Sequence, residues 1–516
     1  MRTFRLTDAE LAALAAGRPH PRTLTVLRRA ELSRHLLLIT ELHRRGGQIP
    51  RWYADRGTLA DPMAALHTAT LLAATPAAAT PAAAAPAAAA PAAAAPAAAA
   101  PAAAAPTVAA PAGATSVAAP VGAAAARIAL DRVTAGRHLT ATHDGLTLRL
   151  RLEDTDPLRS HLGLTPSPRL SADDAAEWQR SLSAAWRLLV TRHRPAAETV
   201  AAVLTVLIPV EPDPGTTGLS ATSADAYGAM ALSAPADPVA FAVGLLHEAQ
   251  HSLLNATRTL FDLVTPGAPR TYSPWRDDPR PVFGLLHGAY AYLAVTRFWR
   301  SERSAGGGRI AEFEFARWRA AVASAAGLLL AGGHLTAAGA RFVQAMRDEV
   351  DPWLAEPVDA GVARLADGAN AEHRARWRLR NLAIAPGSVA ALAEAWRRGE
   401  PAPIPEPELR TGGGRALETS TRLALVHRLL RGSSVDHGTA GDLAYLRGDA
   451  ATALDAYRKS LVSGEAEPWV GMALVSPARS IRERLELVRA TCLALPDVDL
   501  DTVVAWLDVS LNSPPR

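Results

Sequence analysis

The segment from Phe241 to Ala256 constrains the fold most, because it places an H-E-x-x-H pattern inside an apolar helical repeat. His247 and His251 are four residues apart, and positions i and i+4 of an α-helix lie on one face. Two imidazoles on one face can bind a single metal ion, with Glu248 beside it. The sequence therefore predicts a half-buried helix that carries a metal site. The alternative is a chance match on a solvent-exposed helix.

The predicted site needs a third protein ligand, and the next predicted helix offers one. Residues 252–300 contain no glutamate, and their only acids are aspartates: Asp262, Asp277 and Asp278. The only histidine there is His287, in an apolar segment with helical spacing and Pro281 in its first turn. We predict that His287 is the third metal ligand. The alternative is a histidine that only packs in the core.

The connection before this helix, residues 272–281, is predicted to be a loop rich in charged residues. Arg276 and Arg280 flank two aspartates there. A guanidinium group binds a carboxylate in a bidentate manner, so two arginines near a metal suit a carboxylate ligand. The alternative is a set of Arg–Asp ion pairs that only fixes the turn.

Several stretches of the chain together resemble a known family. They are SATSADAYGAMALS, LLHEAQHSLLNA, YSPWRDDPRP and GLLHGAYAYLAVTRFW, with LTDAELAALAAGRPHPRTLTVLRRAELSRHLLLI near the N-terminus. This combination resembles the HExxH-motif domain of ribosomal-peptide modification clusters. That domain occurs alone or fused behind radical SAM maturases of the FxsB type.

The resemblance implies an iron(II)- and 2-oxoglutarate-dependent peptide β-hydroxylase. His247 and His251 would then bind iron, and Glu248 would act beside the metal. Arg276 or Arg280, with Arg297 as a further candidate, would bind the distal carboxylate of 2-oxoglutarate. The expected substrate is a ribosomally made precursor peptide, and a radical SAM maturase of the same pathway is an expected partner.

Two other functions are compatible with the same residues. One is a zinc metallopeptidase, in which Glu248 is the general base that activates a metal-bound water. The absence of a downstream glutamate weakens this reading, and the arginines favour a carboxylate cosubstrate. The other is a non-catalytic scaffold that binds peptides through its helical C-terminal region.

Composition and charge exclude several other classes. There are 54 basic and 50 acidic residues, so the net charge of +4 gives no reason to expect a nucleic-acid partner. Cys492 is the only cysteine, which excludes a disulfide framework and a thiolate cluster. We see no secretory signal and no strongly apolar run long enough to span a bilayer. A cytoplasmic protein without a membrane partner is expected.

The expected fold class is α+β and mostly helical, in four parts. Residues 1–73 form the N-terminal helical segment of the HExxH domain. In residues 74–126 a proline recurs about every fifth position among alanines, which predicts a low-complexity linker. Residues 127–400 are predicted to form a zincin-like catalytic core, and residues 401–516 a C-terminal helical region. The last contains one tetratricopeptide-like hairpin near residues 441–475.

Local patterns within the core predict individual elements. Alternating leucines predict a strand over 146–152, and Ser171 with Asp174 predicts a capping box that opens a helix. Apolar residues predict a strand over 200–210 and another over 227–233, followed by the HExxH helix. In zincin-like folds the edge strand beside the metal helix receives an extended peptide by backbone pairing.

Overall fold

The computed structural model describes residues 4–46, 61–75, 137–213, 218–410, 420–461 and 465–513. Apart from residues 74 and 75, the predicted linker at 74–126 lies outside the described residues. Contacts between residues divide the chain into two compact units. The first comprises residues 1–10, 19–212 and 218–261, and the second comprises residues 11–18, 213–217 and 262–516. The fold is α+β and mostly helical, as predicted.

The first unit contains a five-stranded mixed sheet with the strand order β1-β2-β3-β5-β4. Its strands are β1 (Arg137–His143), β2 (Leu146–Leu152), β3 (Val206–Val210), β4 (Ser220–Thr222) and β5 (Ala229–Ser233). β2, β3 and β5 are parallel to one another, whereas β1 and β4 are antiparallel to their neighbours at the two edges. Asp144 and Gly145 both have positive φ, so a two-residue turn joins β1 to β2. The predicted strands at 146–152 and 227–233 are thus present.

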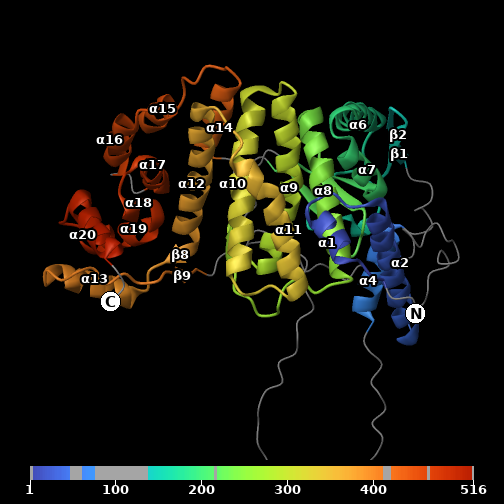
Figure 1. The fold of residues 1–516 in the computed structure, drawn as a ribbon, viewed down its shortest axis with the longest axis horizontal. Helices are drawn as coiled ribbons and strands as arrows, with labels where there is room; N and C mark the ends of the chain where they lie inside the picture. The colour runs from blue at the N-terminus through green and yellow to red at the C-terminus, as the bar shows by residue number, and fades with distance from the viewer. Residues whose placement is uncertain are drawn as a thin grey trace, which may run out of the picture. The chain divides into compact units, whose positions relative to one another are not determined.

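Helices of the first unit pack against this sheet (Figure 1). They are α2 (Pro21–Arg44), α4 (Pro62–Ala74), η3 (Pro157–Leu162), α6 (Ala172–Arg192), α7 (Arg194–Val203) and α8 (Pro238–Arg258). α6 begins with the predicted capping box between Ser171 and Asp174. Trp178 and Trp186 lie on its buried face, as their spacing predicts.

One strand prediction was wrong over half its length. The apolar run at 200–210 was predicted to be a single strand, but α7 extends to Val203 and β3 begins only at Val206. Ala197, Val200 and Val203 are all buried on one side of α7, so these apolar positions follow a helical period. A continuous apolar run fits a buried helix end as well as a buried strand, which explains the error.

The two faces of the sheet are covered by different helices. Val206, Ile208 and Ala229 belong to a buried cluster with Met63 and Leu66 of α4. Leu232 points to the other face because side chains alternate along a strand. A Cβ atom at Gly244 of α8 would lie 3.4 Å from Leu232 Cδ1, so α8 packs closely on that second face. The sheet is therefore covered on both sides, and it supports the helix that carries the H-E-x-x-H pattern.

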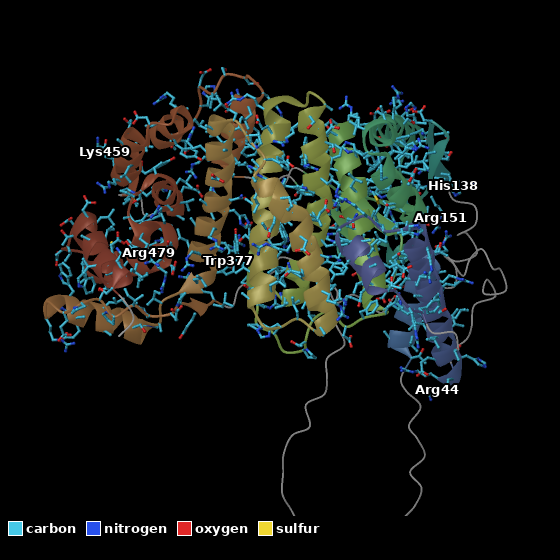
Figure 2. All side chains as sticks on the ribbon, in the orientation of Figure 1. Arg44, His138, Arg151, Trp377, Lys459 and Arg479 are labelled. Atoms are coloured by element: carbon cyan, nitrogen blue, oxygen red, sulfur yellow. The ribbon has the colours of Figure 1, made fainter. Side chains whose placement is uncertain are left out.

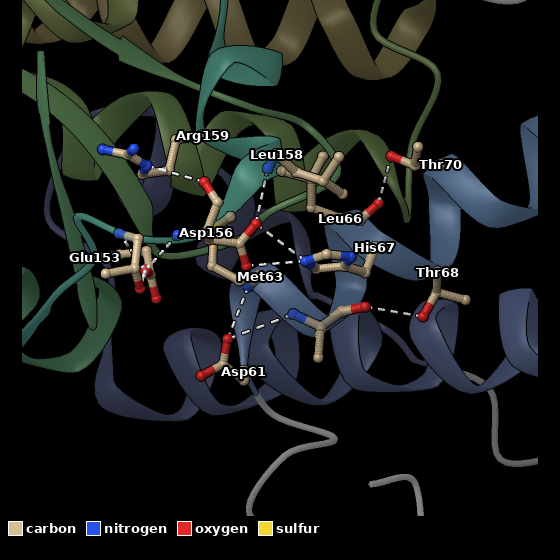
Figure 3. Close-up of polar contacts among 12 residues, drawn as sticks. Asp61, Met63, Leu66, His67, Thr68, Thr70, Glu153, Asp156, Leu158 and Arg159 are labelled. Carbon is tan, nitrogen blue, oxygen red and sulfur yellow. Dashed lines mark hydrogen bonds and ion pairs between the residues drawn. The ribbon is translucent and has the colours of Figure 1, made fainter. Parts of the chain in front are cut away.

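Buried polar contacts connect α4 to the chain that follows β2 (Figure 3). His67 Nε2 lies 2.9 Å from Asp156 Oδ2, and both side chains are almost completely buried. Asp156 also accepts a hydrogen bond from the backbone N–H of Leu158 and so caps η3. Arg151, labelled in Figure 2, donates to Asp61, the N-cap residue of α4. These contacts hold α4 against the segment that contains Arg151 and Asp156. In the sequence, residues 76–136 separate α4 from that segment.

The second unit is built almost entirely from helices. Four long ones come first: α9 (Val282–Ser304), α10 (Gly308–Ala331), α11 (Ala337–Leu354) and α12 (Ala360–Asn381). α10 contacts the other three (Figure 1). α1 (Asp8–Ala15) crosses the division in the chain, and its second half belongs to this unit. Gly332 and Gly333 separate α10 from α11.

Shorter helices and two small antiparallel sheets complete the second unit. One is a hairpin of β6 (Thr271–Ser273) and β7 (Arg276–Arg280), and the other pairs β8 (Leu382–Ala383) with β9 (Glu408–Leu409). The helices are α13 (Pro386–Arg397), α14 (Thr421–Leu430), α15 (Ala440–Arg447), α16 (Ala450–Ser460), α17 (Ala466–Val475), α18 (Arg479–Glu483), α19 (Leu485–Ala494) and α20 (Leu500–Asn512). No helix in the described ranges is both long and apolar enough to span a membrane.

The segment at 272–281, predicted to be a loop, is the β6–β7 hairpin. Trp275 at its turn is buried and stacks on Tyr292 of α9, with ring centroids 5.0 Å apart. Gly288 makes this packing possible, because a Cβ atom there would lie 1.8 Å from Trp275 Nε1. The hairpin is thus fixed to α9 through an aromatic contact that its polar sequence does not reveal.

One hydrophobic core connects the C-terminal helices with the long helices of the second unit. Phe313 of α10 and Leu365 of α12 share a buried cluster with residues of α14 to α20. α15 and α16 form the helical pair predicted near residue 450, and the buried Tyr457 packs where Gly441 and Gly471 leave space. The domain boundaries predicted at 127 and 401 stay predictions, as does the likeness to a tetratricopeptide hairpin.

Candidate metal centre

The sequence folds α8 in a way that presents the H-E-x-x-H residues together. Asp237 caps the helix by accepting a hydrogen bond from the backbone N–H of Ala240 at 2.8 Å, and Pro238 occupies the first helical position. Phe241, Leu245 and Leu253 are completely buried on the side that faces the core. The predicted helix is confirmed, and its burial fixes the direction in which the polar residues point.

His247, Glu248 and His251 form a group whose potential ligand atoms all lie within 4.8 Å of one another. The two imidazole rings are 4.5 Å apart between centroids and almost perpendicular. His247 Nε2 lies 3.9 Å from Glu248 Oε1. Two nitrogen donors and one carboxylate at this separation are a donor set suited to Zn²⁺ or Fe²⁺.

Glu248 occupies an unusual environment for a carboxylate. Its side chain is 1% exposed, and no described group meets hydrogen-bond geometry at either oxygen, although the hydroxyl groups of Ser220 and Thr222 lie close by. Burial raises the pKa of Glu248 to about 8, while the hydroxyl groups of Ser220 and Thr222 act in the opposite direction. A buried carboxylate without a partner is costly, and a nearby cation relieves that cost.

His247 is held in the protonation state that metal binding requires. Burial lowers the pKa of His247 to about 4, so its imidazole is neutral at neutral pH. A histidine must be deprotonated to donate a lone pair to a metal ion. The protein therefore does not need to remove a proton from this residue before a metal binds.

The edge strand β4 lies beside the metal-binding face of α8. β4 pairs only with β5 among the described strands, and it contacts α8. Ser220 and Thr222 belong to β4 and are the residues whose hydroxyl groups affect Glu248. The sequence analysis assigned no role to them, although they lie in the SATSADAYGAMALS stretch. β4 was not among the predicted strands, and the signal available was that residues two apart on a strand lie on one face.

The remaining predicted site residues belong to the second unit. His287 is half-buried on α9, 5.5 Å from the ring of Phe283 between centroids. Among the residues that the structure describes, the group of mutually close donor atoms consists of His247, Glu248 and His251. The role of His287 as a third ligand therefore stays a prediction from the sequence.

The candidate arginines are engaged in ion pairs within the second unit. Arg276 Nε lies 2.7 Å from Asp278 Oδ1, and Arg280 Nη1 lies 3.1 Å from Asp278 Oδ2. These are the pairs expected if the arginines fix the hairpin. Arg297 donates to the carbonyl of Gly17 and pairs with Glu349 at 3.1 Å. Each arginine thus has a contact that stabilises the second unit. Their binding of 2-oxoglutarate stays a prediction from the sequence.

The residues on α8 fit a divalent metal ion by their own chemistry. The buried Glu248 carboxylate lacks a compensating charge within hydrogen-bonding distance, and the neutral His247 has the protonation state of a ligand. Searches of the sequence against protein-family models and curated proteins find no match.

Proposed function

We propose that this protein is an Fe(II)- and 2-oxoglutarate-dependent oxygenase that hydroxylates a β-carbon in a ribosomally made precursor peptide. The observation that carries the proposal is the group His247, Glu248 and His251 on a buried helix beside an edge strand. The resemblance to the HExxH-motif peptide-modification domain favours oxygenase chemistry. In that family bound iron supports the reaction of a C–H bond with O₂ and 2-oxoglutarate to give an alcohol, succinate and CO₂.

The chain's own residues would have distinct tasks in this reaction. His247 and His251 would hold the metal, with His287 as the predicted third ligand. Glu248 would balance the charge of the cation in a position from which water is excluded by burial. β4, as an edge strand of a zincin-like core, would align an extended peptide next to α8 through backbone hydrogen bonds. The tetratricopeptide-like helices at the C-terminus would add a peptide-docking surface.

A zinc metallopeptidase is the second candidate, and one observation favours it. Glu248 immediately follows a ligand histidine and lies 3.9 Å from it, where a general base could activate a metal-bound water. Its pKa of about 8 in the metal-free protein is close to the range of an effective base at neutral pH. The two candidates share the metal centre and differ in cosubstrate and product.

The deciding experiment compares both reactions on the same purified protein. With Fe(II), ascorbate and 2-oxoglutarate, the protein is expected to form succinate and to add one oxygen atom to the peptide encoded beside its gene. Mass spectrometry of the peptide and quantification of succinate measure the two products. Cleaved peptide from the zinc-loaded protein, with no dependence on oxygen or 2-oxoglutarate, would replace the oxygenase with the peptidase.

A further inference from the structure

A cavity of about 210 Å³ lies within the second unit, along α12. α10, α14, α17 and the β6–β7 hairpin also contribute to its wall, and Figure 2 labels Trp377, one of its lining residues on α12. One buried water needs roughly 10–15 Å³ of comparable space, so this cavity can hold a small molecule. The metal-binding residues on α8 take no part in it.

Three hydrogen-bond donors line this cavity without an acceptor. Arg317 Nε, His373 Nε2 and Trp377 Nε1 are buried and have no hydrogen-bond partner among the described residues. The three residues are only 4%, 8% and 6% exposed, respectively. A buried donor that lacks a partner costs about 1–3 kcal/mol, so three around one cavity indicate a ligand rich in acceptors.

The hydrogen bond to Tyr272 explains why His373 Nε2 is a donor. Tyr272 Oη lies 3.0 Å from His373 Nδ1. Burial and the charges of Arg317, Arg376 and Arg374 lower the pKa of His373 to about 3, so the ring is neutral. The tautomer in which the phenol donates to Nδ1 places the single ring proton on Nε2. His373 Nε2 is 3.8 Å from Asp277 Oδ1, which is too far for a hydrogen bond.

No carboxylate around the cavity forms a salt bridge with Arg317 in the described structure, although the charge of Arg317 does act on Glu314. The carboxylates in the wall are engaged elsewhere: Glu372 and Glu467 with Arg376 at 3.1 and 2.6 Å, and Asp277 with Arg380 at 3.9 Å. Glu314, one turn before Arg317, bonds to Trp318 and His427 instead. Within the described structure Arg317 forms no salt bridge, and its guanidinium lies 4.3 Å from the ring of Trp318.

Ser420 and Arg489 also line the cavity, and a further part of the wall is apolar. Leu379, Leu423 and Val470 line the cavity together with the side chain of Trp377. An inorganic ion alone would leave these surfaces without contact, whereas a molecule with an apolar body would cover them.

We propose that this cavity binds a small organic oxyanion, with a carboxylate or phosphate head group on an apolar body. Arg317 supplies the positive charge, and Trp377 and His373 donate hydrogen bonds to the anionic oxygens. The site lies within the second unit and extends beyond the proposed oxygenase function, on which it does not depend.

Isothermal titration calorimetry on the full chain with EDTA present tests this site apart from the metal centre. The probes are 3-phenylpropionate, its phosphate counterpart 3-phenylpropyl phosphate, inorganic phosphate and the neutral 3-phenylpropionamide. At least one organic anion is expected to bind saturably, and the amide is not. The head group that binds more tightly identifies the anion, and weak binding of inorganic phosphate shows that the apolar body contributes.

Variants assign the binding to the cavity. Trp377→Phe removes one donor but keeps an aromatic ring, and it is expected to weaken anion binding about 5-fold. Arg317→Lys keeps the charge but loses the bidentate geometry, with an expected loss of about 10-fold or more. Arg309→Lys on the exposed side of α10 and Trp396→Phe on α13 are matched controls with no expected effect.

The proposal fails if no organic anion binds at millimolar concentration, or if the amide binds as tightly as the acid. It also fails if Trp377→Phe binds the anion as tightly as the unchanged protein. The last result decides even if Arg317→Lys does not fold, because the phenylalanine variant preserves the packing of α12.

Discussion

Glu248 shows what the H-E-x-x-H pattern requires at the scale of a single residue. Its carboxylate is buried in the first unit with no hydrogen bond from the described residues. Desolvation disfavours the charged form of such a group, and burial indeed raises its pKa to about 8. A divalent cation held by the two neighbouring imidazoles would stabilise the charged carboxylate. It would thereby offset the free-energy cost of burying Glu248.

Replacing either histidine on α8 tests the metal centre directly. His247→Ala and His251→Ala are each expected to lower metal affinity by at least about 100-fold, because removing a ligand also leaves Glu248 without its cation. Both residues are only half-buried, so the unfolding midpoint of the metal-free protein should change little. Metal content by mass spectrometry and circular dichroism measure the two effects.

Matched variants distinguish the predicted third ligand from its neighbours. His287→Ala is expected to lose most of the metal affinity, whereas Asp277→Ala and Asp278→Ala keep it. His143→Ala on β1 is the control for removing a partly exposed histidine.

Full metal occupancy and turnover in His247→Ala or His251→Ala would refute the metal site on α8. Anomalous scattering that places an aspartate on the metal would refute the role of His287.

His373 predicts how stability depends on pH. Its pKa is about 3 in the folded protein and about 6.5 in an unfolded chain, so the unfolded state binds more protons between these values. The contribution of His373 to the free energy of unfolding is therefore fully present above pH 6.5. It falls as the pH decreases toward 3, by up to about 1.4 kcal/mol per pH unit. Arg317, Arg374 and Arg376 raise the cost of protonation, and the nearby Asp277 does not offset them.

His373→Gln should make this pH dependence shallower. The measurement compares urea unfolding midpoints between pH 7 and pH 5 in the metal-free protein. The slope that remains will reflect two other groups: His247, whose lowered pKa of about 4 acts in the same direction, and Glu248, whose raised pKa of about 8 acts in the opposite direction. His143→Gln is the control. An identical slope in His373→Gln and the unchanged protein would show that this histidine does not resist protonation.

At the scale of secondary-structure elements, local patterns predict those parts of the fold that local physics determines. The capping box at Ser171 and the alternation over β2 specify a helix start and a half-buried strand within a few residues. The H-E-x-x-H spacing likewise brings two imidazoles together, because i and i+4 are neighbours on any α-helix. For these elements the neighbouring chain supplies all the information needed.

Other elements depend on contacts that no local pattern contains. The strand β7 consists of charged residues and a proline, and the β6–β7 hairpin packs on α9 through Trp275. The cavity along α12 was not predicted at all, because Arg317 and Trp377 come from different helices and belong to no motif. The end of α7 was misread since helix and strand share the same apolar composition there.

The packing of the β6–β7 hairpin on α9 gives a prediction at this scale. In Gly288→Ala the new methyl group would overlap Trp275, whose Nε1 lies 1.8 Å from the Cβ position. We expect a loss of about 1–3 kcal/mol in the free energy of unfolding, as for other overpacked sites. Chemical denaturation measures this loss.

Two further variants separate the clash from helix propensity. Gly387→Ala in α13 adds a methyl group into open space, so it should stabilise the protein by up to about 1 kcal/mol. Combining Gly288→Ala with Trp275→Leu should remove most of the cost of the first change, since the clashing ring is gone. Additive effects of these two substitutions would show that the glycine does not serve the contact with Trp275.

At the scale of the whole molecule, sequence order and spatial order differ within the first unit. α4 precedes residues 76–136, yet Met63 and His67 contact elements that follow them. The chain on both sides of this stretch therefore contributes to one core. Such an arrangement is expected if the alanine- and proline-rich segment is an insertion into a unit that folds around it.

Deleting residues 81–115 tests whether this segment contributes to the fold or to the metal centre. The deletion roughly halves the length of chain between α4 and β1. The free-energy cost of closing a loop changes by only about 0.6 kcal/mol for each twofold change in its length. The unfolding midpoint and the metal affinity should therefore stay as in the full chain. Deleting α4 itself is the matched control, and it should unfold the first unit because Met63 and His67 are completely buried. Lost metal affinity in the 81–115 deletion would assign this segment a part in the site and refute its role as an insertion.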